Sequence, residues 1–316
     1  YRSAYMYVMF VRQLRTQSLH VGNMMQRSSF CSSSDRTEDF VVMISGLPGR
    51  MGIGLAEAVV NRFGASTLLP FALTGEGMGE SVRIKDSVDE RLIPPSRREE
   101  MWEEEREFAS EAEKTVVAID FTHPDAALPN VRFYSQERIP FVMGTTGGDM
   151  DVMERTVMET NDETYAVIAP NMGKPIVVFQ AMVDSAAKVF PNALKGYKLD
   201  VVESHQSGKA DTSGTAKAVV ESMGGLGLDG STEKIQMIRE PEQQVAEMGV
   251  PKEHLGHHAF HTYRIASPDN SVEIVLEHNI CGSAVYHEGT LDALQFLLRQ
   301  RENGNPKRLW NMMDIL

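Results

Sequence analysis

The residues best suited to chemistry lie in the segment 203–216, which contains His205, Lys209 and a Ser-Gly-Thr run. An unperturbed imidazole has a pKa of about 6.5, so His205 can give up a proton near neutral pH. Lys209 adds a cation that can hold an acidic group of a substrate. We therefore interpret the segment as an active-site loop that binds a small anion and protonates it.

The elements around this segment place it between a strand and a helix. The apolar run 199–202 predicts the strand, and the helix is indicated by apolar residues at helical spacing: Ala216, Val219, Val220 and Met223. Thr212 or Ser213 can cap this helix. The backbone N–H groups of Gly214 and Thr215 are then available to a carboxylate or phosphate, which the helix dipole favours.

A glycine-rich turn follows the strongly apolar run 40–45, which predicts a buried strand. Its glycines are Gly46, Gly49 and Gly52, and a helix with one apolar face is expected next, from Met51, Leu55 and Val59. Glycine permits a tight turn and a close approach of the backbone, and the helix N-terminus faces the anion. The turn therefore fits the pyrophosphate of a dinucleotide, although its G-x-x-G-x-x-G spacing also fits an ordinary strand-to-helix connection.

Three later segments repeat this layout. Each is a short apolar strand that opens into small or polar residues: 116–119 before Asp120-Phe121-Thr122, 140–143 before Gly144-Thr145-Thr146, and 165–168 before Ala169-Pro170-Asn171. In a doubly wound parallel sheet these carboxyl ends line one crevice, where ligands bind. We predict a Rossmann-type α/β domain with a doubly wound parallel sheet. The acidic stretch 97–114 is interpreted as a solvated helix.

The organisation changes after residue 171. A helix is expected at 177–189, and four strands are expected at 199–202, 234–238, 258–265 and 272–280, the last two as a hairpin. These elements predict an α+β domain with an open mixed sheet and helices on one face. Its exposed edges favour a homo-oligomer.

A last helix at 290–299 is expected to return to the first domain. The predicted organisation has three parts: a leader at 1–38, a dinucleotide-binding domain at 39–171 completed by 283–316, and a substrate-binding and oligomerisation domain at 172–282.

Composition excludes several classes of partner. Removing the four arginines of the acid-free stretch 1–34 from a net charge of −13 leaves −17, and so acidic a body is a poor binder of nucleic acid. No apolar run approaches the ~18 residues of a membrane span. No spacing typical of zinc or iron ligands appears, so we expect no metal. The cysteines, Cys31 and Cys281, provide no disulfide framework, and we interpret Cys281 as a core residue.

The ordered motifs resemble those of 4-hydroxy-tetrahydrodipicolinate reductase, also called dihydrodipicolinate reductase, in its plant-type branch. The similarity spans about residues 40–300 and continues through Gln243-Gln244-Val245, His258-Ala259-Phe260-His261 and His278-Asn279-Ile280-Cys281-Gly282. It implies an NAD(P)H-dependent oxidoreductase that reduces the dehydrated cyclic imine of 4-hydroxy-tetrahydrodipicolinate to tetrahydrodipicolinate in lysine biosynthesis by the diaminopimelate route. A small dicarboxylate substrate and a homo-oligomer, a dimer or tetramer, are implied as well.

The resemblance assigns roles to residues of the first segment. It places His205 at the general acid and Lys209 at the substrate-binding cation, and Ser213, Gly214 and Thr215 on the substrate-carboxylate loop. The residues expected to bind the cofactor are Gly46, Gly49, Arg50, Met51, Gly52, Phe121, Gly144, Thr145, Thr146, Ala169, Pro170 and Asn171.

The sequence departs from the family at one position and matches its plant-type branch at another. Gln206 stands where many bacterial members have a second histidine, as it does in the plant-type branch. Ser283 stands where that branch usually has arginine, and Arg264 or Arg50 is a candidate to compensate. His261 and His278 are interpreted as sheet residues that could support the site from behind.

Several alternatives remain at the level of sequence. Glu76, about 20 residues past the glycines, favours NAD, whereas Arg50 favours a 2′-phosphate, so we expect both NADPH and NADH to serve, with NADPH slightly preferred. The basic, serine-rich leader is typical of a transit peptide and indicates the plastid stroma, with the mitochondrion or cytoplasm as alternatives and a disordered terminus as the other interpretation. Another Rossmann-type reductase of a small carboxylated imine or semialdehyde, or a non-catalytic dinucleotide sensor, would share only part of the pattern.

Overall fold

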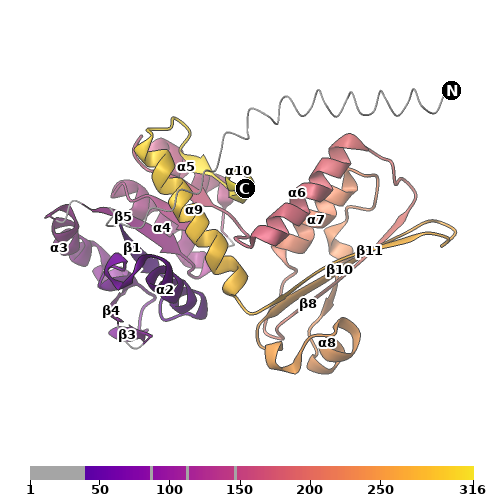
Figure 1. The fold of residues 1–316 in the computed structure, drawn as a ribbon, viewed down its shortest axis with the longest axis horizontal. Coiled ribbons are helices and arrows are strands. Elements are labelled where there is room, and N and C mark those ends of the chain that lie inside the picture. The colour runs from indigo at the N-terminus through magenta and orange to yellow at the C-terminus, as the bar shows by residue number, and fades with distance from the viewer. Residues whose placement is uncertain (1–39, 86–87, 112–113, 146–147) are drawn as a thin grey trace. The chain divides into compact units, whose positions relative to one another are not determined.

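The computed structural model describes residues 40–316 except 86–87, 112–113 and 146–147, so the leader expected at 1–38 lies outside the described residues. An eight-stranded sheet and a four-stranded sheet organise this part of the chain, and helices pack against both (Figure 1). Among these residues, none of the helices combines the length and the apolar character that a membrane span requires.

The larger sheet has the strand order β12-β7-β6-β5-β1-β2-β4-β3. Its strands are β1 (Phe40–Ser45), β2 (Phe71–Leu73), β3 (Ser81–Ile84), β4 (Val88–Ile93), β5 (Thr115–Asp120), β6 (Phe141–Met143), β7 (Ala166–Ile168) and β12 (Leu309–Trp310). Only the β3–β4 pair is antiparallel in this sheet. Because β2 lies on one side of β1 and β5 on the other, a topological switch point falls between β1 and β5, where doubly wound sheets bind ligands. The Rossmann-type fold predicted from the sequence is confirmed.

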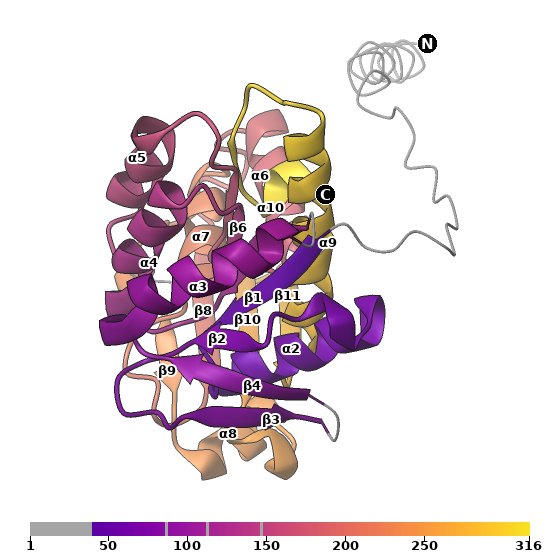
Figure 2. The same ribbon diagram turned by 90° about the vertical axis from the view of Figure 1, so that its left-hand side faces the viewer.

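Helices cover both faces of this sheet because its strands alternate apolar side chains between two cores. Val42 and Ile44 pack with α2 (Arg50–Phe63) and α9 (Ala284–Glu302). Val41 and Met43 pack on the other face with α3 (Arg98–Glu111), α4 (Pro124–Gln136) and α5 (Met150–Thr160). Figure 2 shows α2 and α9 on one side of the sheet and α3, α4 and α5 on the other.

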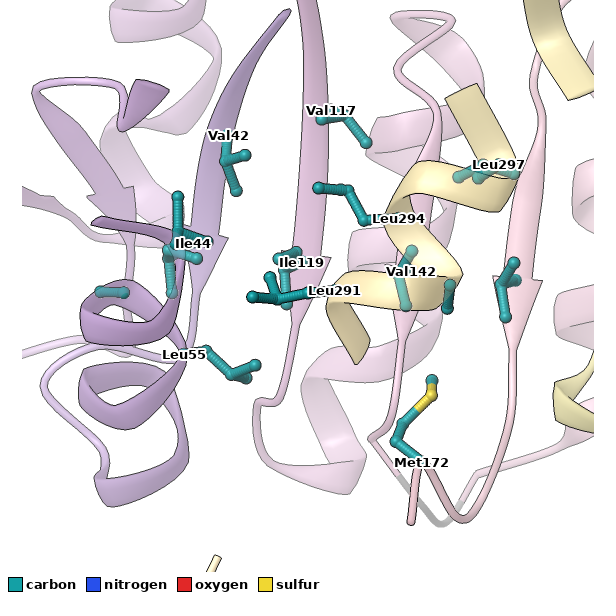
Figure 3. Close-up of a cluster of buried hydrophobic side chains, with 14 of the residues drawn as sticks. Val42, Ile44, Leu55, Val117, Ile119, Val142, Met172, Leu291, Leu294 and Leu297 are labelled. Carbon is teal, nitrogen blue, oxygen red and sulfur yellow. The ribbon is translucent and has the colours of Figure 1, made fainter. Parts of the chain in front are cut away.

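The helix α9 completes the first of these cores. Leu291, Leu294 and Leu297 are buried with Val117 and Ile119 of β5, as Figure 3 shows. Each such leucine contributes about 1.5–3 kcal/mol when it is fully buried. The last helix thus packs against the larger sheet, and it is longer than the predicted 290–299.

The smaller sheet has the order β11-β10-β8-β9. Its strands are β8 (Lys198–His205), β9 (Gln236–Ile238), β10 (His258–Ala266) and β11 (Glu273–Cys281). β10 pairs antiparallel with β8 and β11, whereas β9 pairs parallel with β8, so the predicted mixed sheet and hairpin are confirmed. At the hairpin turn Asn270 has a φ of 55°, a left-handed conformation that asparagine tolerates.

Helices α6 (Lys174–Val189) and α7 (Gly214–Gly224) cover one face of the smaller sheet (Figure 1). Val183 and Val219 pack there against Val201 and Tyr263. The remaining helices are α8 (Pro241–Met248), α10 (Met312–Ile315), and the 3₁₀ turns η1 (Ala65–Thr67), η2 (Pro95–Arg97), η3 (Thr232–Lys234) and η4 (Lys252–His254). The strand predicted at 234–238 starts only at Gln236, because η3 precedes it.

Strand β8 is longer than the predicted 199–202 and includes the first residues of the proposed active-site loop. Side chains two apart on a strand share a face, so Glu203 and His205 lie on the same face as Val201, beneath α6 and α7. The interpretation of 203–205 as loop was wrong. Their polar side chains are carried into the interior by the strand's alternation.

Candidate active site

Three loops meet closely at the carboxyl ends of β1, β5 and β6. Gly46 has a φ of 115°, and a Cβ there would lie 2.2 Å from the carbonyl oxygen of Phe121. The ring of Phe121 lies against Gly144, where a Cβ would meet it at 2.2 Å. Only glycine fits at position 46, because a Cβ there would overlap backbone atoms, whereas at Gly144 the ring of Phe121 would have to move. The N-cap of α2, Gly49, provides no side-chain cap, which leaves the first N–H groups of the helix available to an anion.

These features fit a dinucleotide. The turn 46–49 lies between β1 and the N-terminus of a 14-residue helix, beside the switch point of the sheet, and its Leu47 side chain is buried. Gly49 and Gly52 pack against the carbonyl oxygen of Gly46, where a Cβ would approach to 2.6 and 2.8 Å. The turn is therefore tightly packed, and it leads directly into the N-terminus of α2, where a pyrophosphate would bind.

A buried carboxylate holds the loops after β5 and β6. Asp120 Oδ1 accepts hydrogen bonds from Thr122 Oγ1 at 2.8 Å and Thr145 Oγ1 at 2.7 Å. Its Oδ2 accepts from Asn130 Nδ2 and from Tyr134 OH, both at 2.8 Å and both on α4. Burial raises the pKa of Asp120, and these four side-chain hydrogen bonds oppose that shift. Asp120 thus fixes the predicted cofactor loops from below.

One hydrogen bond joins a predicted cofactor loop to the predicted substrate loop. Asn171 Nδ2 donates to Thr215 Oγ1 at 3.0 Å, and Asn171 Oδ1 accepts from the Gly173 N–H at 2.7 Å. Ala169 extends the larger sheet by donating its N–H to the Met143 carbonyl at 3.0 Å, and Pro170 is exposed. The segment 169–171 therefore lies beside the start of α7.

The other predicted cofactor residues are placed less tightly. Arg50 opens α2 and donates to the carbonyl of Gly256 at 3.3 Å, in the loop before β10. Met51 packs partly into the core, and Thr146 lies outside the described residues. Glu76 accepts hydrogen bonds from the N–H and hydroxyl of Ser96 at 2.9 and 3.2 Å. Both residues weighed for the choice between NADPH and NADH thus have protein partners.

His205 ends β8 and is only 8% exposed. Its Nε2 lies 3.3 Å from Nε2 of His261 on β10, and the two rings meet edge to face. Burial lowers the pKa of His205 to about 3 and that of His261 to about 2, and the cations of Arg239 and Lys209 act in the same direction. Both imidazoles are therefore neutral near pH 7, and one Nε2–H donates to the other Nε2.

Further imidazole and phenol groups lie behind this pair. His261 stacks on His278 of β11 with a centroid separation of 4.4 Å, and Tyr263 OH lies 3.2 Å from Nε2 of His278. The strand register places His261 opposite both Glu203 and His278. The Nδ1 atoms of His261 and His278 are buried without hydrogen-bond partners. The two histidines thus form the interior side of the site.

Glu203 binds the start of α7, where the sequence predicted a Ser or Thr side-chain cap. Its side chain is fully buried, and its Oε2 accepts the N–H of Ser213 at 2.9 Å. Ser213 is the N-cap residue of α7, but neither its hydroxyl nor that of Thr212 makes a capping hydrogen bond. The expectation of a Ser or Thr side-chain cap was therefore wrong. A carboxylate from the neighbouring strand binds the helix start instead, which leaves the N–H groups of Gly214 and Thr215 for a ligand.

Arg239 neutralises this carboxylate and holds the loop. Its Nη2 donates to Glu203 Oε1 at 2.5 Å, its Nε to the Lys209 carbonyl at 2.8 Å, and Nη2 also to the Asp211 carbonyl at 3.2 Å. Gln244 donates to the His205 carbonyl at 2.6 Å. Lys209 Nζ pairs with Asp211 at 2.7 Å, so its charge is balanced locally until a stronger anion competes.

Glu203, His205 and His261 bring three potential metal-ligand atoms within 4.8 Å of one another. Both oxygens of Glu203 already have partners, at Arg239 and Ser213. A divalent cation bound there would also face the guanidinium of Arg239, which disfavours a metal at these three residues.

Other sequence interpretations change. Cys281, read as a core residue, is exposed because its side chain points away from the covered face of β11. Arg264 forms an ion pair with Glu273 at 2.6 Å near the hairpin turn, far along β10 from His258, and so it does not replace the missing arginine at 283. Ser283 is the N-cap of α9 and makes no side-chain cap.

Sequence reasoning missed Glu203, Arg239 and Asp120 as site-building residues. Two of them carried a signal. Glu203 lies two residues before His205 on an apolar strand, and Asp120 ends another, so each is a charged residue in the pattern of a buried one. Arg239 directly follows a predicted strand but has no such pattern, and its partner is 36 residues away.

The Rossmann-type sheet, followed by a mixed sheet that holds a buried histidine beside a helix start, defines a class: two-domain reductases that use a nicotinamide dinucleotide. Family models for the N-terminus and the C-terminus of dihydrodipicolinate reductase match residues 40–172 and 175–316. The chain belongs to the dihydrodipicolinate reductase family.

Known proteins are similar to this chain over most of its length. The chain is 40% identical to the probable 4-hydroxy-tetrahydrodipicolinate reductase 2, chloroplastic, of Oryza sativa subsp. japonica, over 88% of this chain and 83% of that protein. It is 40% identical to the chloroplastic reductase 1 of Arabidopsis thaliana, over 87% of this chain and 77% of that protein. A dipicolinate-bound dihydrodipicolinate reductase from Paenisporosarcina sp. TG-14 has the same fold, with a TM-score of 0.57, 18% identity, and coverage of 88% and 99%.

Proposed function

We propose that the protein reduces the cyclic imine formed by loss of water from 4-hydroxy-tetrahydrodipicolinate, and so produces tetrahydrodipicolinate for lysine biosynthesis by the diaminopimelate route. Family membership over residues 40–316 supports this activity. The observation that carries it in the structure is the hydrogen bond from Asn171 to Thr215. It joins the crevice of the larger sheet to the start of α7, the helix start that we propose binds the substrate anion. His205 lies in the smaller sheet, at the end of β8.

The chain's own residues then divide the work. A bound nicotinamide supplies the hydride. The N–H groups of Gly214 and Thr215 bind one substrate carboxylate at the start of α7, and Lys209 leaves Asp211 to bind an acidic group of the ring. His205 supplies the proton that neutralises the charge left on the ring. A non-catalytic dinucleotide sensor would need neither the anion-binding groups nor the proton donor.

The test is NADPH or NADH consumption with substrate freshly generated from pyruvate and aspartate semialdehyde. We expect turnover by the wild type and a loss of about 10²–10⁴-fold in His205→Gln, which keeps a hydrogen-bonding side chain of similar size but delivers no proton. Gln206→Ala is the matched control, with a smaller effect. A folded wild type that binds cofactor without turnover would refute the proposed reductase activity. Near-full activity of His205→Gln would leave His205 only a positioning role.

We further propose that both NADPH and NADH serve, with a slight preference for NADPH. The support is that the Glu76 carboxylate accepts two hydrogen bonds from Ser96, while Arg50, at the N-terminus of α2, makes only one hydrogen bond of 3.3 Å within the described part of the chain. The ratio of kcat/KM for the two cofactors measures the preference. We expect Arg50→Ala to shift that ratio toward NADH, and an unchanged ratio would remove Arg50 from phosphate recognition.

The organisation of the whole protein is proposed on similar grounds. Residues 39–171 with 283–316 form the dinucleotide-binding domain, and 172–282 form the substrate and oligomerisation domain. A homodimer or homotetramer is supported by the exposed edge strand β11, with Ile274 and Val275 at 42% and 40% exposure. The chloroplastic relatives support a plastid location. Sedimentation measurements and the targeting of a fusion to residues 1–38 test these two points.

A further inference from the structure

The smaller sheet holds two buried imidazoles in direct contact beside a buried carboxylate. The Nε2 atoms of His205 and His261 are 3.3 Å apart, and Nε2 of His261 lies 3.9 Å from Glu203 Oε2. His261 is 1% exposed, deeper than His205. Two neutral imidazoles share one N–H···N hydrogen bond here. An added proton leaves that bond in place and makes it charge-assisted, so the pair is built to hold one extra proton.

The fixed charges around the pair cancel. Glu203 is paired with Arg239, and Lys209 with Asp211. The other groups against His261 are uncharged near pH 7, because burial lowers the pKa of His278 to about 4 and raises the pKa of Tyr263 further above its ordinary, already alkaline value. Without a substrate, burial therefore keeps both imidazoles neutral near pH 7.

A dicarboxylate substrate would change this balance by adding two negative charges. At a separation of about 5 Å in a partly buried site, each carboxylate favours the protonated pair by on the order of a hundredfold. Two carboxylates are thus sufficient to bring the pair from neutral to charged near neutral pH. A neutral imidazole is a poor acid, so this change would create the proton donor only when it is needed.

We propose that His205 and His261 act as one proton-holding pair that takes up a proton from solvent when the dicarboxylate binds, and that His205 then passes this proton to the substrate. The inference rests on the proposed function. After the ring has received hydride, an N–H bond of His205 breaks, the hydrogen bonds to the ring atom that gained charge, and the imidazole keeps the electron pair. The pair is then neutral again. His261 touches His205 and not the substrate, so it is a positioning residue that shares the proton.

The first test measures the proton directly. Pyridine-2,6-dicarboxylate, an unreactive planar dicarboxylate, is titrated calorimetrically into NADPH-saturated protein at pH 7, in buffers of different ionisation enthalpy. The dependence of the heat on the buffer gives the number of protons taken up. We expect about one for the wild type and less than half of that for His261→Gln, whose amide can still hydrogen-bond to His205 but cannot hold a proton. His258→Gln is the matched control: His258 is 4% exposed and is satisfied by Ser204 and His254, so uptake should match the wild type.

The second test follows the reaction. We expect His261→Gln to lower kcat/KM at pH 7 by about 10–100-fold with no change in the KM for NADPH, and the wild-type KM for substrate to rise about tenfold per pH unit on the alkaline side. Wild-type binding without proton uptake, or wild-type uptake and rate in His261→Gln, would overturn the pair. The measurements on the wild type test the proposal even if His261→Gln does not fold. A wild type that takes up a proton with the analogue but never turns over the substrate would instead refute the proposed function.

Discussion

Arg239 gives the sharpest test of how the candidate anion-binding loop is held. Its guanidinium reaches the carbonyls of Lys209 and Asp211, at 2.8 and 3.2 Å, and the carboxylate of Glu203 at 2.5 Å. Lysine keeps the charge but presents a compact head that cannot reach all three acceptors in the same planar fork. We expect Arg239→Lys to keep the ion pair with Glu203 and to lose both loop carbonyls.

The size of the effect follows from those contacts. A hydrogen bond to a charged donor is worth ~1.5–3 kcal/mol, and water recovers part of it because Asp211 is exposed. About 1 kcal/mol for each carbonyl gives about 2 kcal/mol for the loop, which corresponds to about 30-fold in kcat/KM. The free energy of unfolding should fall by at most about 2 kcal/mol, because Glu203 remains paired. Arg239→Met, in contrast, leaves a buried carboxylate alone and should lower the free energy of unfolding by about 3–5 kcal/mol.

Steady-state kinetics at saturating NADPH, together with thermal melting, separate the two outcomes. Arg264→Lys is the matched control, because its ion pair with Glu273 is about half exposed and lies near the hairpin turn. We expect that control to leave kcat/KM and Tm unchanged. Unchanged kcat/KM in Arg239→Lys, or an unchanged Tm in Arg239→Met, would show that other contacts hold the loop and that the reasoning is wrong.

Four further variants probe other groups. Lys209→Ala should lower kcat/KM for substrate by about 10–100-fold without affecting the KM for NADPH. Asp211→Asn removes a competing anion and should not weaken substrate binding. If Lys209→Ala affects the KM for NADPH as strongly as kcat/KM for substrate, Lys209 does not contact the substrate directly. Asp120→Asn should weaken NADPH binding and lower the denaturation midpoint, because an amide cannot accept all of the hydrogen bonds that Asp120 accepts; calorimetry and urea unfolding measure both, and a wild-type affinity would contradict the role. Burial raises the pKa of Glu90 from 4.5 to about 8, so Glu90 keeps a proton in the folded state that it loses in the unfolded chain. The free energy of unfolding therefore falls as pH rises from 4.5 toward 8. The advantage in stability of Glu90→Gln should therefore grow by about 1.4 kcal/mol per pH unit in this window, and an advantage that is the same at pH 5 and pH 7.5 would refute a buried neutral carboxyl.

The larger sheet could be predicted from the sequence because its strands carry their own signal. Runs such as 116–119 and 165–168 are short, apolar and followed at once by small or polar residues, and this is how buried parallel strands end. The glycine turn was predictable for a similar reason. The packing of Phe121 on Gly144 was not, since it depends on two loops that become neighbours only when β5 and β6 pair.

The end of β8 shows the opposite case. A glutamate, a serine and a histidine in succession favour a loop when each is weighed alone, yet Glu203 and His205 are buried on a strand. The burial is possible because Arg239 neutralises Glu203 and because both imidazoles stay neutral. These partners come from β10 and from the residue after β9, so nothing local in the sequence reports them. The helix-cap prediction failed for the same reason, because the group that binds the Ser213 N–H belongs to a neighbouring strand.

Each sheet thus places a buried carboxylate directly beneath its candidate ligand loops. Asp120 binds the loops after β5 and β6, and Glu203 binds the start of α7 together with the side chain that holds the preceding loop. A buried carboxylate is costly unless all of its acceptor positions are used, so it tolerates only one arrangement of the donors around it. This constraint gives the loops a fixed shape before any ligand arrives, which lowers the entropy that binding must remove. Substrate and cofactor affinity should therefore depend on residues that touch neither molecule, and a survey limited to direct contacts would miss them.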